Sequence, residues 1–292
     1  MIERLCVIGV GLIGGSLALA LKEAEYVGHV VGVGRGAANL ALARERGIID
    51  EASHDPAAAV RGADMVLLAV PVGSVEAVCR QLAPALAEEA VLTDAGSVKG
   101  AVVAQVRRAF GGRVPARFVP GHPIAGTEQS GAGAAFAELY LGRRVLLTPL
   151  AETDPDATAR VEAMWRAAGA EVERMTVAHH DEVLAATSHL PHLLAFGLVD
   201  SLARQEESRE IFRYAAGGFR DFTRIASSDP VMWRDICLHN AEAILAALGA
   251  YRADLAELER AIAAGDGNAL EAIFRRAKAA RDRFCSDSTG CK

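Results

Sequence analysis

The chain contains few of the residues that mark metal centres, membrane spans or nucleic-acid partners. Its five cysteines are scattered and form no C-x-x-C pair, which predicts reduced thiols and no metal site. Acidic residues outnumber basic ones, and the net charge of −6 argues against nucleic acid or an anionic membrane as a partner. No apolar run reaches the length of a bilayer span, and the N-terminus has no signal-peptide pattern. We therefore expect a cytoplasmic protein.

A glycine-rich turn follows the first apolar segment. Residues 5–8 lead directly into a G-x-G-x-x-G motif made by Gly9, Gly11 and Gly14. Gly9 permits a tight turn, Gly11 lets the backbone approach a pyrophosphate, and Gly14 lets the next helix pack closely on the strand. We expect that helix over about residues 13–25, with its N-terminal amides directed at the phosphates. The pattern predicts a dinucleotide site; the alternative is a glycine-rich turn without a ligand.

The second predicted strand, residues 29–33, is not followed by the acidic residue that usually holds a free ribose 2′-hydroxyl. Gly34 and Arg35 stand at that strand end instead. Glycine leaves room there, and the guanidinium fork of Arg35 suits a 2′-phosphate. The segment therefore favours NADP over NAD. The alternative is that Arg35 lies over the adenine ring and leaves both cofactors usable.

The first half of the chain alternates short β-branched runs with alanine-rich helical stretches, which is typical of a parallel α/β sheet. Further strands are predicted at residues 64–71, 90–94, 118–119, 144–148 and 171–174, and helices at 37–46 and 157–168. Together they predict a Rossmann-type doubly wound sheet of six or more parallel strands, which binds ligands at the carboxyl ends of its strands. We expect this nucleotide-binding domain to span residues 1–176.

The strand signal disappears after residue 176, and residues 177–292 are expected to form an all-α domain. Helices are predicted at about residues 179–204, near 211, at 231–264 and at 269–284. The third of these carries apolar residues at alternating steps of four and three, namely Ile244, Leu248, Tyr251, Leu255, Leu258 and Ile262. Such a seam can face another helix of the same chain or the same helix of a second subunit. Its length favours a homodimer.

Two segments rich in polar groups follow predicted strands of the sheet. Residues 94–100 contain Ser97 at the expected start of a helix, where its hydroxyl can cap the helix or face the cofactor cleft. Residues 120–128 contain His122 between a glycine and a proline, which restrict its backbone and suit a group that must be aimed. A buried structural histidine is the alternative for His122. Its place at a strand end favours a functional role.

Two further segments lie in the helical half. The run Ser188-His189-Leu190-Pro191-His192 places two histidines three residues apart, but no acid or cysteine stands where it could complete a metal site. Arg220 and Arg224 follow a pair of glycines, and arginine is the natural clamp for a carboxylate. We expect Arg224 to bind a ligand. Arg220 is the next candidate, with a salt bridge to neighbouring acids as its alternative.

Five motifs thus follow one another along the chain: Gly9–Ser16, Asp94–Lys99, Gly121–Gly126, Ser188–His192 and Gly218–Arg224. The series resembles the prephenate/arogenate (cyclohexadienyl) dehydrogenase family of tyrosine biosynthesis, and the likeness runs from Met1 to about Phe284. The resemblance implies a Rossmann domain, a helical dimerisation domain and an active site between them. It also implies oxidative decarboxylation of prephenate, L-arogenate or both, with hydride transfer to NAD(P).

The resemblance implies roles for individual residues. His122 matches the family's catalytic histidine, and Ser97 matches the serine that shares its hydrogen bond to the substrate hydroxyl. Arg224 matches the arginine that holds a substrate carboxylate. Further pocket positions are His192, Thr127 and Glu128, and the expected cofactor contacts are Gly9, Gly11, Leu12, Ile13, Gly14, Arg35 and Val70. The departure is Arg35, where NAD-using members carry an acid; we expect NADP, with NAD as the alternative.

Two other functions compete with this interpretation. A β-hydroxyacid dehydrogenase also joins a Rossmann domain to a helical one, but is expected to use a catalytic lysine. The chain has four lysines, and only Lys99, two residues after Ser97, lies near the predicted cleft. A non-catalytic NADP-binding sensor needs no base at the hydride site, so the presence of His122 and Arg224 argues against it. Prephenate and L-arogenate differ in a keto or an amino group on the side chain, and the sequence singles out no residue that would bind this group.

Overall fold

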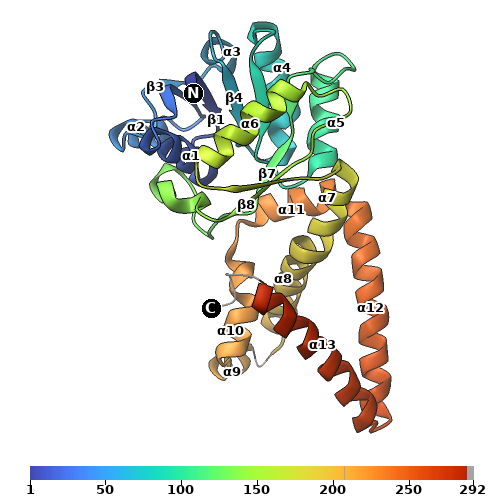
Figure 1. Cartoon of the computed structure of the whole chain (residues 1–292). Coiled ribbons are helices and arrows are strands. Elements are labelled where there is room, and N and C mark those ends of the chain that lie inside the picture. Colours follow the sequence, from blue (N-terminus) through green and yellow to red (C-terminus); the bar gives the residue numbers. More distant parts are fainter. Residues whose placement is uncertain (207, 288–292) are drawn as a thin grey trace. The chain divides into compact units, whose positions relative to one another are not determined.

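Six parallel strands form the central sheet of the first half of the chain (Figure 1). The computed structural model describes residues 1–206 and 208–287. The sheet order is β3-β2-β1-β4-β5-β6, made by β1 (Ile2–Ile8), β2 (Val27–Val33), β3 (Glu51–Ser53), β4 (Met65–Leu68), β5 (Val91–Asp94) and β6 (Phe118–Val119). The Rossmann-type sheet is therefore confirmed. The edge strand β3 is an addition to the prediction, because its mostly exposed residues carry no apolar signal.

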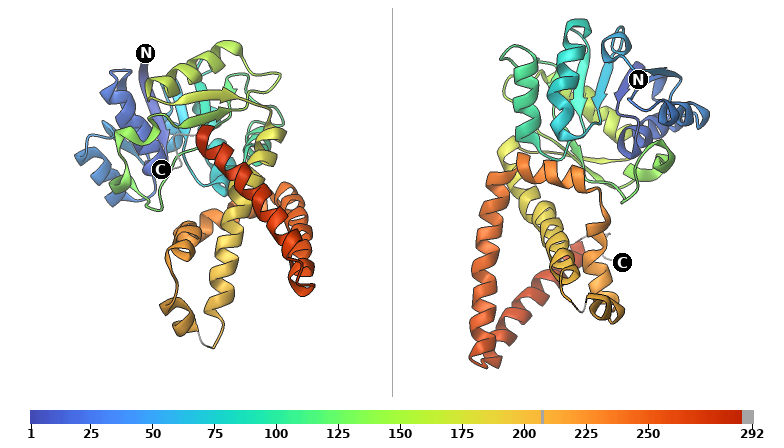
Figure 2. Two further views of the ribbon diagram at one scale, coloured as in Figure 1. Left: turned by 60° about the horizontal axis from the view of Figure 1, so that its bottom comes forward. Right: turned by 180° about the vertical axis from the view of Figure 1, so that it is seen from behind.

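Helices cover both faces of this sheet, and each face has its own core. Residues Leu5 and Val7 of β1 belong to one core, while Cys6 and Ile8 belong to the other, because successive side chains of a strand point to opposite faces. The first core lies against α1 (Leu12–Glu23), α2 (Ala37–Glu45) and α6 (Pro155–Ala167), and the second against α3 (Pro56–Ala59), α4 (Val75–Leu82) and α5 (Lys99–Ala109). The view from behind in Figure 2 shows α4 and α5, in teal, on the face opposite α6.

A second, three-stranded sheet adjoins the first. It consists of β7 (Gly121–Pro123), β8 (Arg144–Leu147) and β9 (Glu171–Arg174), with β7 antiparallel to β8 and β8 parallel to β9. The prediction that β8 and β9 extend the parallel sheet is therefore wrong. Pro120, which has no N–H to donate, separates β6 from β7, and its carbonyl accepts a hydrogen bond from Thr148 N (2.9 Å). This turn places His122 on β7 rather than at the end of the central sheet.

From Val177 the described chain is helical. It contains α7 (Val177–Leu184), a π-helical turn (Ala185–His189), α8 (Leu190–Ala203), α9 (Ser208–Arg213), α10 (Gly217–Thr223) and α11 (Pro230–His239). Pro191 lacks the N–H that a regular α-helix would use, and the π turn directly before it widens the helix there. By length and composition alone, Val177–Ala203 is apolar enough to cross a membrane, which corrects the expectation that no such run exists.

The predicted helix over residues 231–264 is two helices, α11 and α12 (Ala241–Ala263). They meet at Asn240, whose backbone leaves the helical region (φ −114°, ψ 32°) and whose side chain is buried. By internal contacts the chain forms two units, Met1–Ile244 and the residues from Leu245 onward, and the second unit holds most of α12 together with α13 (Gly267–Asp287).

The cysteines follow the expectation in part. Cys6, Cys79 and Cys237 are free thiols. Cys285 takes part in a disulfide, which corrects the expectation of reduced thiols throughout. Cys291 lies outside the described residues.

Candidate active site

The glycine turn after β1 has the close packing that its sequence predicts. Gly9 has a φ of +100°, and a Cβ atom built there would lie 2.2 Å from the carbonyl oxygen of Ala69. A Cβ atom on Gly14 would lie 2.4 Å from Gly9 O and 2.7 Å from a methyl group of Val7. Any side chain at these two positions would therefore force β1, β4 and α1 apart.

Gly11 has open space instead, since the nearest atom to a Cβ built there is Gly131 N at 4.0 Å. Gly11 is also the N-cap residue of α1, where no side chain caps the helix, so its first amide groups remain available to an external acceptor. The carbonyl of Ile13 accepts a hydrogen bond from Tyr140 Oη (2.6 Å), and Val70 lies half-buried beside Gly9. This cradle fits a pyrophosphate.

Arg35 follows β2 and is exposed. In the described part of the chain its guanidinium has no hydrogen-bond or ion-pair partner. The neighbouring carbonyl of Gly34 is held by His54 Nδ1 (2.7 Å), which fixes the loop after the strand. A free guanidinium at this strand end can accept a phosphate as partner.

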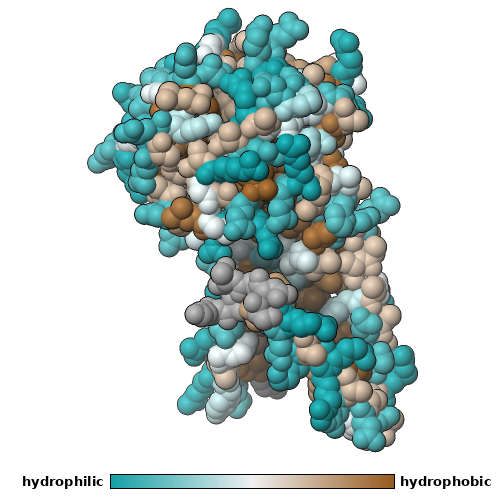
Figure 3. All heavy atoms as spheres, viewed as in Figure 1, coloured by the Kyte–Doolittle hydropathy of each residue, from teal (hydrophilic) through white to brown (hydrophobic). Residues whose placement is uncertain are grey.

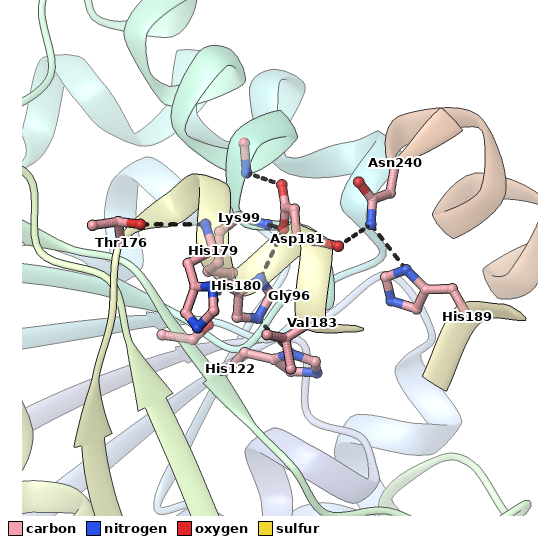
Figure 4. A network of polar contacts seen from close by, with 12 residues as sticks. Gly96, Lys99, His122, Thr176, His179, His180, Asp181, Val183, His189 and Asn240 are labelled. Atoms are coloured by element: carbon pink, nitrogen blue, oxygen red, sulfur yellow. Dashed lines mark hydrogen bonds and ion pairs between the residues drawn. The ribbon is translucent and has the colours of Figure 1, made fainter. Parts of the chain in front are cut away.

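His122 lies half-buried on β7 and faces α7, the first helix of the second half (Figure 4). Its Nδ1 atom is 2.9 Å from Nε2 of His180, and the two rings pack edge to face with centroids 5.1 Å apart. Burial lowers the pKa of His122 well below 6.5, and the nearby His180, Lys99 and His189 lower it further. The ring is therefore neutral near pH 7 and can accept a proton.

Asp181 connects α7 to the start of α5. Its Oδ1 accepts hydrogen bonds from His180 Nδ1 (2.7 Å) and Lys99 N (2.9 Å), and its Oδ2 accepts one from Gly100 N (2.8 Å). Burial alone would raise the pKa of Asp181, but these hydrogen bonds together lower it. Asp181 thus caps α5 from a distant part of the chain.

Ser97 does not cap that helix, which corrects the local interpretation of its hydroxyl. The N-cap residue of α5 is Val98, and Ser97 lies half-buried in the bend before it. Among the described residues Ser97 Oγ has no hydrogen-bond partner. The hydroxyl is consequently available to a ligand.

Lys99 is fully buried and joins the ends of β5 and β7. Its ammonium group donates hydrogen bonds to the carboxylate of Asp94 and to the carbonyl of Gly121, the residue before His122. Burial lowers the pKa of Lys99, while the charge of Asp94 opposes this shift. With its ammonium group engaged inside the protein, Lys99 serves the backbone of β7 and does not suit the role of an exposed catalytic lysine.

The two histidines of α8 and its π turn have separate environments. His189 is buried, its Nδ1 is 3.1 Å from Nδ2 of Asn240, and burial lowers its pKa to about 4. His192 stacks on Trp233 with ring centroids 3.7 Å apart, and its Nδ1 donates to Ser188 O (2.9 Å). In the described residues no group of three or more His, Cys, Asp or Glu side chains could hold a metal ion.

Arg224 forms an ion pair with Glu128, which joins the loop after β7 to the turn after α10. The Arg224 side chain remains 65% exposed. Thr127 lies next to Glu128 and accepts a hydrogen bond from Gln129 N (3.2 Å). Arg220 is exposed on α10. The structure thus brings Arg224 and Glu128 together and leaves Arg220 outside that pair.

His180, Asp181, Asn240 and Trp233 are site residues that local sequence patterns do not single out. Near these residues, two buried side-chain nitrogens have no hydrogen-bond partner in the described residues, namely His189 Nε2 and Trp233 Nε1. Buried polar groups are normally paired, so these two donors suit a polar ligand or ordered water. The only sequence signal is the run His179-His180-Asp181, which directly follows the last strand-forming segment.

Known families and structures match nearly the whole chain. The family model for the prephenate dehydrogenase nucleotide-binding domain matches residues 17–174, and that for the prephenate dehydrogenase dimerization domain matches residues 176–276. A cyclohexadienyl dehydrogenase of Zymomonas mobilis is 40% identical over 96% of this chain and 95% of its own.

Two solved structures are also similar. A prephenate dehydrogenase of Aquifex aeolicus, in complex with hydroxyphenyl propionate and NAD+, superimposes with a TM-score of 0.90 at 37% identity, covering 97% of this chain and 99% of that one. An arogenate dehydrogenase of Synechocystis superimposes with a TM-score of 0.81 at 29% identity, covering 97% and 100% of the two chains.

Proposed function

Since the chain belongs to the prephenate dehydrogenase family, we propose that it catalyses the oxidative decarboxylation of prephenate, L-arogenate or both, with hydride transfer to NAD(P). The products are 4-hydroxyphenylpyruvate or tyrosine, and CO₂. The observation that carries the proposal is the state of His122, which is neutral, half-buried and held by His180 through Nδ1, so that Nε2 remains for a substrate.

The chemistry requires a proton acceptor at the substrate hydroxyl. The substrate is a cyclohexadienol that loses hydride from its carbinol carbon and CO₂ from the opposite ring carbon, and aromatisation makes the reaction favourable. His122 accepts the hydroxyl proton while the carbinol C–H bond breaks, and such general-base help contributes about 10²–10⁴-fold. When bound, the nicotinamide supplies the hydride acceptor.

The remaining site residues hold the substrate in place. Ser97, whose hydroxyl has no hydrogen-bond partner among the described residues, shares the hydrogen bond to the substrate hydroxyl. Arg224 binds a substrate carboxylate and exchanges its present partner, Glu128, for that group. His192 keeps Nε2 as an acceptor for the substrate, since its Nδ1 donates to Ser188 O. Thr127 and Arg220 complete the pocket.

Steady-state rates with prephenate and with L-arogenate test this function directly. With at least one of the two substrates, we expect reduction of the cofactor and release of CO₂. The reduction is monitored by the absorbance of the reduced cofactor. A β-hydroxyacid as the better substrate, or cofactor binding without turnover of either compound, would contradict the proposal. The buried position of Lys99 makes the first of these outcomes unexpected.

NADP is the preferred cofactor in this proposal, and Arg35 provides the preference. Its exposed guanidinium lies where an acidic residue would bind the ribose of NAD. Arg35→Ala should raise the KM for NADP about tenfold, as expected for a lost charge-assisted hydrogen bond, and leave the KM for NAD nearly unchanged. Arg44→Ala is the matched control, because Arg44 is an exposed arginine on the neighbouring helix α2. Equal changes for both cofactors would place Arg35 over the adenine.

The working unit is a homodimer in the cytoplasm. Support for the dimer comes from the match to a dimerization domain and from exposed apolar residues of the predicted seam, among them Tyr251, Leu255 and Ile262. We place the boundary between the nucleotide-binding and helical domains at residue 176, in the short segment between β9 and α7.

A further inference from the structure

Three side chains form a continuous hydrogen-bonded series that ends at the reacting base (Figure 4). Asp181 Oδ1 lies 2.7 Å from His180 Nδ1, and His180 Nε2 lies 2.9 Å from His122 Nδ1. The His180 side chain is fully buried, so water cannot supply alternative partners for either of its nitrogens. The hydrogen-bonding state of each ring therefore depends on its neighbour.

The direction of these hydrogen bonds follows from Asp181. Both carboxylate oxygens accept backbone N–H groups, Oδ1 from Lys99 and Oδ2 from Gly100. A carboxylate in this position can only accept, so His180 carries its proton on Nδ1. A neutral His180 then accepts at Nε2, and His122 must donate from Nδ1. The lone pair of His122 is left on Nε2, the atom that serves as the base.

We propose that His180 and Asp181 are positioning residues that set the tautomer and the ring orientation of His122, so that Nε2 is the basic nitrogen. The inference rests on the proposed function, since it assigns the means by which that reaction's base is prepared. The same logic operates in the serine protease triad, where a buried aspartate fixes the tautomer of the catalytic histidine. Here a second imidazole stands between the carboxylate and the base.

The arrangement is held from two sides. The carboxylate of Asp181 caps the N-terminus of α5, where two amides and the helix dipole favour its negative charge. The backbone carbonyl of Asp181 accepts a hydrogen bond from Asn240 Nδ2 (2.9 Å), which ties α7 to the junction of α11 and α12. Asp181 consequently cannot turn away from His180 without breaking the start of another helix.

The charges around the two rings come from several elements. His180 faces Asp181 on α7, Lys99 on α5, Asp94 on β5 and His122 on β7, and His189 approaches His122 from the π turn. Burial lowers the pKa of both His180 and His122, although Asp181 opposes the shift in His180. Both rings are therefore neutral at pH 8, the state in which the proposed tautomers can be measured.

The first test is a direct measurement of the tautomers in the unaltered protein. Long-range ¹⁵N–¹H spectra of histidine-labelled protein at pH 8 distinguish a protonated Nδ1 from a protonated Nε2, and His122→Gln assigns the signals. We expect Nδ1–H in both His122 and His180. A His122 ring protonated on Nε2 overturns the inference, and this result does not depend on any activity.

The second test is a matched pair of variants at His180. In His180→Gln the side-chain amide reaches the place of Nε2 and can still accept from His122. In His180→Asn it reaches only the place of Nδ1 and can still donate to Asp181. We expect kcat of His180→Gln to stay within a few-fold of wild type, and kcat of His180→Asn to fall about 10- to 100-fold, as for a misplaced catalytic group.

The controls separate this inference from other causes. Cofactor affinity should be unchanged in both variants, and thermal unfolding reports any general damage to the fold. Equal kcat losses in the two variants, or a larger loss in His180→Gln, would show that His180 merely fills space. If wild-type protein turned over neither prephenate nor L-arogenate, the proposed function would fail, and the spectra alone would still confirm or overturn the tautomers.

Discussion

The sheet-bearing half and the helical half of this chain differ in how many of their large apolar side chains are buried within the chain. Most large apolar side chains of the sheet-bearing half are buried within the chain, including Phe118, Tyr140 and Trp165 at 0% exposure, and Leu141 at 60% is an exception. On the face shown in Figure 3, teal hydrophilic residues and tan, moderately apolar residues are mixed over that half, with only small brown patches. The helices after Leu245 instead expose Leu245 (65%), Ile262 (66%) and Phe274 (59%). The first half completes its own core, whereas the second requires a partner to cover its apolar surface.

The candidate site draws on both halves unequally. The glycine turn, Ser97 and His122 come from the sheet-bearing half. The turn follows β1, Ser97 follows β5 and His122 lies on β7. The groups that hold His122, and the arginine for the substrate carboxylate, come from the helices. The comparison indicates that cofactor binding depends on the first half alone, while turnover requires both. The following predictions test that division.

The largest effect is expected from His122→Asn. Turnover should fall by about 10²–10⁴-fold, because the amide of asparagine cannot take over the role of His122 as acceptor of the substrate hydroxyl proton. Cofactor affinity, measured by fluorescence titration, should remain nearly unchanged, since the glycine turn does not involve this side chain. A near-normal rate, or an equal loss in cofactor affinity, would show that His122 is a structural residue.

The next effect concerns assembly. Leu248→Glu combined with Leu255→Glu places charges in the seam of α12, where each leucine buried in a dimer contributes about 1.5–3 kcal/mol. We expect monomers or insoluble protein by light scattering, with cofactor binding retained in any soluble fraction. Leu42→Glu, at a leucine on α2 about as exposed as Leu255 (38% and 42%), should leave the dimer intact. A wild-type monomer at micromolar concentration would assign the seam to contacts within one chain.

A smaller effect is expected from Arg224→Ala. The KM for the substrate should rise about 5- to 30-fold with kcat little changed, because a carboxylate clamp acts equally in the ground and transition states. The exposure of Arg224 and its existing pair with Glu128 limit the gain from binding substrate. Arg220→Ala, the next candidate for the carboxylate, is measured beside it, and Arg213→Ala, at an exposed arginine on α9, is the control. A larger rise in KM for Arg220→Ala would move the carboxylate to that residue.

The smallest effect is a pH dependence of stability from the buried histidines. Burial lowers the pKa of His122, His180 and His189, the last to about 4, so between that value and 6.5 the folded protein binds fewer protons than the unfolded chain. The free energy of unfolding should therefore fall by about 1 kcal/mol or more from pH 7.5 to 5.5. Urea unfolding at fixed protein concentration measures this decrease in the free energy of unfolding.

A control variant sharpens this last measurement. His54→Gln, at an exposed position, should leave the pH dependence unchanged. A flat stability profile between pH 7.5 and 5.5 would mean that the buried histidines titrate in the folded protein at the same pH as in the unfolded chain.

Local patterns in the sequence were sufficient to predict the glycine turn of the nucleotide-binding half, with the strand before it and the helix after it. An apolar run of four residues followed by spaced glycines specifies a strand, a turn and a helix, and Gly9, Gly11 and Gly14 lie in that arrangement. Each signal involves neighbours in sequence, so no distant contact was required to interpret it. The start of α11 is local in the same way, because Asp229 caps the helix and Pro230 occupies its first position.

Only the tertiary structure decided which groups surround His122. His180 is 58 residues from His122 in the chain, and Asp181 is 82 residues from the Lys99 amide that it caps. Neither contact leaves a periodic trace in the sequence. The break of the long helix at Asn240 and the separate sheet of β7, β8 and β9 have the same origin, because Asn240 bonds Asp181 and β7 pairs with β8 across a long loop. Propensity acts over a few residues, whereas these features depend on hydrogen bonds between distant segments.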